Sequence, residues 1–98
     1  MDKVGSFNEY ILNDLKTDDD IKEWINIGFD EFLTNNDLNA FVKALEYAVR
    51  AKDTISGLSK KTGISRSNLY AIFNGEQQPQ LSTALKIIKE LGYTVKVA

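Results

Sequence analysis

A short polar stretch in the second half of the chain has the residue types and the spacing needed to read nucleic-acid bases. Residues 65–70, SRSNLY, place hydroxyl, guanidinium, amide and phenol groups on the outer side of a predicted helix, in its N-terminal half. An arginine there can bind guanine through two hydrogen bonds, which are worth about 1–3 kcal/mol of discrimination. The stretch therefore predicts contact with the major groove of DNA. The side chains concerned are Ser65, Arg66, Ser67, Asn68 and Tyr70.

The flanking residues predict that two helices joined by a tight turn hold this polar face. The first helix is predicted over residues 55–62, and Gly63 leaves it in a left-handed conformation that costs a residue with a Cβ about 1 kcal/mol. Ile64 then turns into the core, and Ser65 caps the second helix. The predicted buried side carries Leu58, Ile64, Leu69 and Ile72. This order indicates a helix-turn-helix, and the alternative is an ordinary helical hairpin.

Four more helices are predicted around this motif. Apolar periodicity places them over residues 7–15, 19–34, 38–52 and 81–91, and Gly92 ends the last one. Residues 93–97, YTVKV, alternate as a β-strand does, and the chain offers no partner strand, so we expect pairing with a second copy. The predicted buried sides carry Phe7, Tyr10, Ile11 and Leu15; Ile21, Trp24, Ile25, Phe29, Phe32 and Leu33; Leu38, Phe41, Val42, Leu45, Ala48 and Val49; and Leu81, Leu85, Ile88 and Leu91.

Composition favours one cytoplasmic domain without catalytic activity. The 98 residues are 43% hydrophobic and include neither cysteine nor histidine, which excludes disulfides and thiolate or imidazole metal sites. The commonest general base is also missing. No apolar run approaches the roughly 20 residues that span a bilayer, and no signal-peptide core begins the chain. We therefore expect no catalytic residue, no metal, no cofactor and no membrane contact.

Charge is distributed unevenly along the chain. Residues 1–38 carry ten acids and three bases, for a net charge of −7, whereas residues 39–98 carry four acids and nine bases, for +5. Attraction to phosphates depends on the local field rather than on the total charge of −2. The second part is therefore compatible with DNA binding, although its modest charge predicts weak binding by a monomer. Its bases near the motif are Lys43, Arg50, Lys52, Lys60, Lys61 and Arg66.

From Ile55 to Leu91 the chain resembles the lambda-repressor-like (Xre-type) helix-turn-helix family. The shared positions are Leu58, Ser59, Gly63, Ser65, Arg66, Ser67, Asn74, Gly75, Pro79, Leu81 and Leu85. The flanks are similar to a narrower group, the addiction-module antidote proteins, which are HigA-like antitoxins. These flanks are residues 10–16 (YILNDLK), the acidic helix ending near residues 36–37, residues 41–45 (FVKAL) and the closing residues 91–93 (LGY).

The resemblance implies an all-α fold, a lambda-repressor-like helix-turn-helix bundle of about five to six helices with a short C-terminal β-strand. It divides the single domain, 1–98, into acidic N-terminal helices (7–38), a DNA-binding core (39–92) and the strand (93–97). It also implies a homodimer that binds double-stranded DNA at its own operator and represses its operon. Carried over by position, base reading falls on Arg66, Ser67 and Tyr70, and phosphate contacts fall near Asn68 and Asn74.

The same resemblance implies a cognate toxin protein of the ribonuclease type as the second partner. Toxins that attack RNA need basic surfaces to hold phosphates, so the acidic N-terminal half is the expected contact. Asp30 and Glu31 are the residues that we assign to it.

Two positions depart from the broader family pattern. Ile55 stands where a phosphate-bracing glutamine is usual, and Ser59 stands where alanine is usual. These departures keep an alternative open, namely a protein-binding module of the same fold that has lost specific DNA binding. A solvated helix surface is likewise an alternative explanation for each polar residue of the motif.

Overall fold

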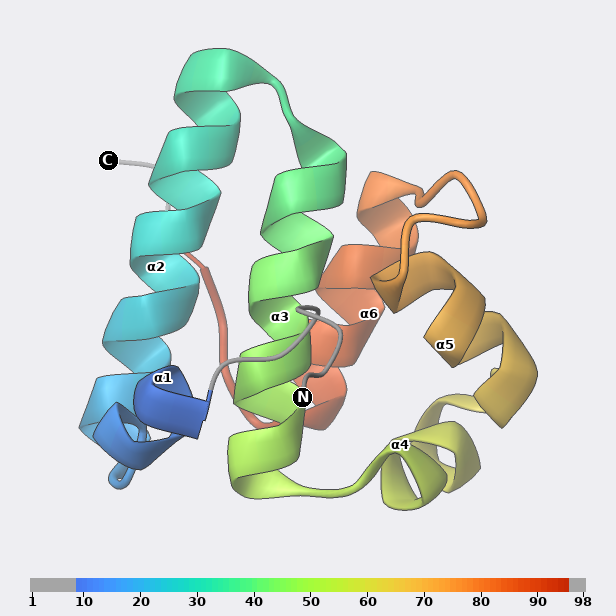
Figure 1. Ribbon diagram of the computed structural model, residues 1–98, viewed down its shortest axis with the longest axis horizontal. Helices are drawn as coiled ribbons and strands as arrows, with labels where there is room; N and C mark the ends of the chain where they lie inside the picture. Colours follow the sequence, from blue (N-terminus) through green and yellow to red (C-terminus); the bar gives the residue numbers. More distant parts are fainter. Residues whose placement is uncertain (1–8, 96–98) are drawn as a thin grey trace.

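A computed structural model of the chain describes residues 9–95, which form six α-helices and no strand (Figure 1). The predicted all-α class is confirmed, and each helix agrees with its predicted range within a few residues. The predicted helix start at Phe7 lies outside the described residues. Within residues 9–95, no helix has the length and apolar character needed to cross a membrane. The helices are α1 (Glu9–Asp14), α2 (Asp18–Asn35), α3 (Leu38–Lys52), α4 (Ile55–Thr62), α5 (Arg66–Phe73) and α6 (Leu81–Glu90).

Helix α3 lies at the centre, and all five other helices pack against it. Its apolar residues occupy more positions than the single apolar face of an amphipathic surface helix, which fits a helix that neighbours cover on several sides. Helix α2 runs back along α3, and Phe29, Phe32 and Phe41 form an aromatic cluster between them with ring centroids 5.6–6.1 Å apart. The buried residues of α3 are Phe41, Val42, Leu45, Glu46, Tyr47, Ala48 and Val49.

Local capping sets the helix ends. The Thr17 hydroxyl accepts from the Asp20 N–H, and the Asp20 carboxylate accepts from the Thr17 N–H, which completes a capping box at the start of α2. The Asp37 carboxylate caps α3 by accepting from the Ala40 N–H, without a return bond. At the end of α6, Gly92 has φ +92°, and the Tyr93 N–H bonds to the Ile88 carbonyl as in a Schellman motif. The predicted glycine cap at Gly92 is confirmed.

Several residues predicted to be buried are exposed instead. Helix α6 turns Ala84, Ile87, Ile88 and Leu91 toward α3 and α4, which leaves Leu81 and Leu85 on the outside. Both the buried set, which begins at Ala84, and the predicted set, which begins at Leu81, recur every three to four residues. The small Ala84 side chain lets α6 approach its neighbours closely, which favours burial of the set that contains it. Leu33 and Tyr10 are also exposed, because the faces of α2 and α1 that pack on α3 do not extend to them.

The predicted C-terminal strand is not found. Residues 93–95 are irregular, and residues 96–97 lie outside the described residues. The left-handed turn at Gly92 sends the chain back across the start of α2, where the Tyr93 hydroxyl donates to Asp18 Oδ1 at 2.7 Å. Lys52 Nζ donates to the same oxygen at 2.9 Å and lies 5.0 Å from the centroid of the Tyr93 ring. A contact between three elements of the same chain therefore replaces the strand.

This junction makes stability depend on pH. The Tyr93 hydroxyl, and then Lys52, hold the pKa of Asp18 below its ordinary value of 3.8. Because the folded-state pKa is lowered, the stabilisation is complete above pH 3.8 and disappears as the pH falls through the folded-state pKa.

We expect Tyr93→Phe to lower the urea midpoint of unfolding at pH 7. The effect should become smaller as the pH falls below 3.8, because a protonated Asp18 accepts a weaker hydrogen bond from the hydroxyl than a carboxylate does. Tyr70→Phe is the matched control, since Tyr70 is exposed on α5 and its hydroxyl is engaged by no bond within residues 9–95. Equal losses at pH 7 and pH 3 would show that the Asp18 bond is not what the tyrosine contributes.

Candidate nucleic-acid interface

The two helices of the predicted motif are joined by residues 63–65, a three-residue turn. Gly63 has φ +80°, and its N–H closes α4 by bonding to the Ser59 carbonyl at 2.9 Å. The Ser65 hydroxyl accepts from the Asn68 N–H at 3.1 Å and opens α5. Ile64 is half-buried and packs against the core, rather than fully buried as predicted. The predicted glycine elbow and serine cap are confirmed.

The two departures from the family pattern have structural roles. Ser59 Oγ donates to the Ile64 carbonyl at 2.6 Å, across the turn, which an alanine could not do. Ile55 is 4% exposed and packs in the core at the first position of α4. Position 55 therefore provides apolar packing and no polar group for a phosphate.

A hollow of about 340 Å³ lies between the start of α4 and the outer face of α5. Arg66 and Tyr70, one turn apart on α5, line it together with Arg50 at the end of α3. Residues 53–56 complete the wall. They include Asp53, whose carboxylate pairs with Lys61, and Thr54, which caps α4 by accepting from the Gly57 N–H at 2.9 Å. Two arginines and the positive end of a helix dipole thus line the opening together with one carboxylate that is already paired, and this balance suits an anion.

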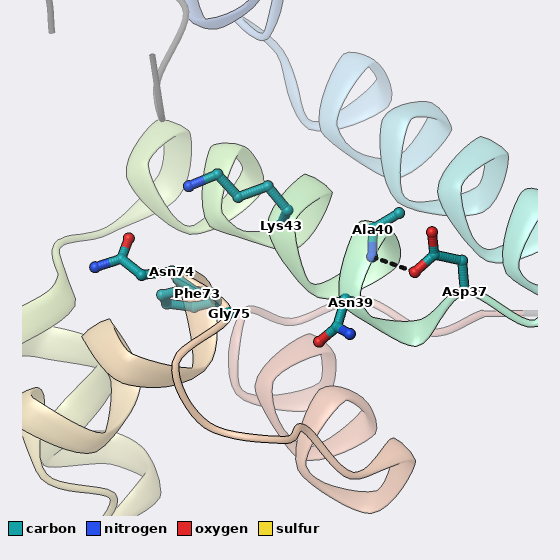
Figure 2. A pocket seen from close by; sticks show the side chains of 7 residues that line it. All are labelled: Asp37, Asn39, Ala40, Lys43, Phe73, Asn74 and Gly75. Carbon is teal, nitrogen blue, oxygen red and sulfur yellow. Dashed lines mark hydrogen bonds between the residues drawn. The ribbon is translucent and has the colours of Figure 1, made fainter. Parts of the chain in front are cut away.

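A second, wider hollow of about 600 Å³ lies at the C-terminal end of α5, between it and the start of α3, and Asp37 is part of its lining (Figure 2). Lys43 and Asn39 of α3 line it, opposite Asn74 and Gly75 at the end of α5. In Figure 2 the Lys43 and Asn74 side chains extend in the same direction, past the Phe73 ring. Polar hollows therefore lie near both ends of α5.

A buried carboxylate connects the two hollows. Glu46 is 4% exposed, and its two oxygens accept from Lys43 Nζ at 2.8 Å and from Arg50 Nη2 at 3.0 Å. The three residues follow one face of α3 at i, i+3 and i+7, which keeps both cations beside α5. Glu46 was not identified from the sequence. Its position three residues after Lys43 and four before Arg50 could have indicated these ion pairs, because such spacings place the three side chains on one helix face.

Ion pairs neutralise much of the predicted basic surface. Lys43 and Arg50 share Glu46, Lys52 binds Asp18, and Lys61 Nζ lies 2.8 Å from Asp53 Oδ2. The ammonium of Lys61, and then the Thr54 N–H, lower the pKa of Asp53. Within the described residues, Lys60 and Arg66 carry no such pair. Arg66 is therefore the cation of α5 that can meet an anion without breaking an existing bond.

The structure places the predicted residues in four groups. Arg66 and Tyr70 share the first hollow, and Asn74 lines the second. Ser65, Ser67 and Asn68 are exposed at the start of α5, where Ser65 is already bonded to the Asn68 backbone. Asp30 and Glu31 are exposed on α2, which packs along a different part of α3 from α5 (Figure 1).

One family model matches nearly the whole chain. Residues 5–98 match the family described as "Probable addiction module antidote protein". The chain is also 29% identical over 76 residues to an uncharacterized protein of Haemophilus influenzae, and the aligned region covers 78% of this chain and 77% of that protein. No solved structure matches the chain significantly.

The Ser59 hydroxyl provides a test of the turn. We expect Ser59→Ala to lower the free energy of unfolding by about 0.5–1.5 kcal/mol, because the variant loses the bond to the Ile64 carbonyl. Ser56→Ala, at an exposed position of the same helix, is the matched control and should change stability by less than about 0.5 kcal/mol. Urea denaturation measures both. If Ser59→Ala were as stable as Ser56→Ala, the bond would not stabilise the turn.

Proposed function

The chain belongs to the family of probable addiction module antidote proteins, and we propose that it is the antitoxin of a type II toxin–antitoxin module. In this proposal it neutralises a ribonuclease-type toxin by direct binding and represses its own operon in the cytoplasm. DNA is bound through α4 and α5 as a helix-turn-helix. The observation that carries the DNA part is the exposed, unpaired Arg66 at the start of α5, beside a hollow that suits a phosphate.

The geometry around α5 supports separate roles for its residues. In the proposal, Arg66, Ser67 and Tyr70 contact base edges, because they occupy the exposed N-terminal half of α5. The short side chains of Ser65, Asn68 and Asn74 suit phosphate oxygens. Phosphate contacts position the helix on the duplex, and base contacts specify the sequence. The two hollows beside α5 then lie where the backbone strands on either side of the groove would pass.

A homodimer is part of this proposal. The ion pairs of α3 and α4 weaken the positive electrostatic field of one chain. A two-fold dimer would double the number of phosphate contacts and would place two recognition helices about 34 Å apart. The exposed Leu81 and Leu85, one turn apart on α6, supply apolar surface for such a contact. The number of chains bound per DNA duplex in the electrophoretic shifts described below tests the dimer.

The acidic N-terminal half supports the toxin contact. Asp30 and Glu31 are exposed on α2, and no ion pair within residues 9–95 neutralises either side chain. A toxin that holds RNA must present a basic surface, so an acidic face on α2 would speed association and compete for that surface.

A second candidate function is a protein-binding module that has lost specific DNA binding. The burial of Ile55 favours it, because the first turn of α4 then offers no polar side chain at that position. The two candidates share the toxin contact and differ only in DNA binding.

DNA binding depends on Arg66 in the first candidate. We expect the protein to bind its upstream DNA with steep salt dependence, and Arg66→Ala to weaken this specific binding by about 1–3 kcal/mol with little change in thermal midpoint. Arg66→Lys is the matched control: it should retain the salt dependence and lose preference at one base pair, because an ammonium cannot form the two parallel bonds. Electrophoretic shifts with the upstream DNA measure both. Equal binding by wild type and Arg66→Ala would favour the second candidate.

Toxin association depends on the acidic face in both candidates. We expect Asp30→Lys with Glu31→Lys to slow association with the neighbouring gene's product by a few-fold to about tenfold and to make the rate less sensitive to salt. The neutral pair Asp30→Asn with Glu31→Gln should fall between this variant and wild type. Stopped-flow mixing at two salt concentrations measures the rates. Identical rates at low salt would place the toxin site elsewhere.

A further inference from the structure

A small hollow of about 160 Å³ lies where α1 meets α2. Its apolar lining consists of Leu15, which is buried, Trp24, which is half-buried, and Ile27, which is 51% exposed. Three carboxylates complete the lining: Asp14 at the end of α1, and Asp20 and Glu23 on the first turns of α2. The hollow therefore combines an apolar floor with an acidic rim.

The polar group on the floor of this hollow, the Trp24 indole N–H, is already bonded, whereas, within the described residues, the carboxylates of the rim have oxygens free to accept hydrogen bonds. The Trp24 indole N–H donates to the Ala44 carbonyl of α3 at 2.8 Å, which fixes the orientation of the ring. Asp20 uses one oxygen to accept from the Lys16 and Thr17 N–H groups, which leaves its other oxygen available. Asp14 and Glu23 are exposed, and no bond or ion pair within residues 9–95 engages them.

We propose that this hollow receives an arginine side chain of the toxin, with the guanidinium among the three carboxylates and its methylene stem against Trp24 and Ile27. The inference rests on the proposed function, because it names the contact through which α2 holds its basic partner. A guanidinium stacks on an indole and forms paired bonds with carboxylates, whereas an ammonium is a compact, strongly hydrated charge. The hollow therefore suits arginine better than lysine.

Size and chemistry exclude other occupants. The volume has room for roughly five water molecules, below the range of about 300–1,000 Å³ for small-molecule pockets. Within residues 9–95, no group of acidic side chains is close enough to hold a metal ion. The end of one basic side chain fits both limits. Arginines buried against aromatic residues are also common among the side chains that dominate protein–protein affinity.

The hollow adjoins the acidic surface of α2 already assigned to the toxin. Glu31 follows Ile27 by one helical turn, so the rim residues and Glu31 lie along one side of the helix. The arginine would thus anchor the contact, and the acids farther along α2 would act mainly on the association rate.

The single tryptophan of the chain gives a direct measurement. The full-length protein, labelled with 15N, is titrated with the peptide acetyl-Gly-Arg-Gly-amide at low salt while the indole N–H signal of Trp24 is followed. Peptides with citrulline, which keeps the shape without the charge, and with lysine replace the arginine peptide in parallel. We expect a saturable shift with arginine, a weaker response with lysine and none with citrulline.

The variants locate the site. Asp14→Asn with Glu23→Gln should weaken arginine-peptide binding by about two- to thirtyfold, because each exposed ion pair adds a modest amount. Asp30→Asn with Glu31→Gln is the matched control, which removes two charges of α2 outside the hollow and should leave binding within about twofold. Both variants change exposed residues, so their thermal midpoints should match wild type.

Three results would overturn the proposal: no shift with arginine, an equal shift with citrulline or lysine, or unchanged binding by Asp14→Asn with Glu23→Gln. A shift produced by raising the protein concentration alone would assign the hollow to a second copy of this chain and would also overturn it. The titration uses neither toxin nor DNA. It can therefore fail while the toxin and DNA experiments succeed, or succeed while they fail.

Discussion

The burial of α3 on several sides is the constraint on which the rest of the structure depends. Five helices pack on this one element, so the residues of α3 that a neighbour covers are apolar except for Glu46. Four of its polar residues, Asn39, Lys43, Glu46 and Arg50, fall along the face next to α5, whereas Lys52 at its end binds Asp18. Because α3 is enclosed, it acts as a rigid support, and the surfaces of α2 and α5 are both fixed relative to it.

Glu46 shows a conflict between charge and burial that this support has to resolve. A buried carboxylate is unfavourable unless cations and hydrogen bonds compensate it, and here Lys43 and Arg50 both do so. The same pairing reduces the positive field beside α5, where the proposed DNA contact needs it. Glu46 therefore holds Lys43 and Arg50 in place but reduces their long-range attraction for DNA phosphates. In the proposed function, affinity for DNA then depends on short-range contacts, above all that of Arg66.

Features set by neighbours in sequence could be predicted, and features set by packing could not. The Thr17, Asp37 and Ser65 caps and the glycines at 63 and 92 satisfy backbone groups only a few residues away, so their types alone located the helix ends. The exposure of Leu81 and Leu85 could not be predicted, because α6 carries two apolar stripes and α3 selects one. The irregular segment after Gly92 depends on Asp18, 75 residues from Tyr93. The polar face of α5 could be predicted because it follows from residue types within one helix. The burial of Glu46 and the hollow at Trp24 could not, because they depend on how the helices pack.

The position of the two proposed binding surfaces limits how they can influence each other. Helices α2 and α5 pack on different parts of α3, so a toxin held at Trp24 leaves the hollow of Arg66 and Tyr70 uncovered. Glu31, by contrast, lies near Asp37 and Ala40, which also line the second hollow. A toxin that changed DNA affinity would need different binding energies for two states of the protein. Direct competition within a single chain is confined to the second hollow, which shares Asp37 and Ala40 with the surroundings of Glu31. Any coupling elsewhere arises from contacts that the toxin itself makes with DNA, or from a change in how two chains associate.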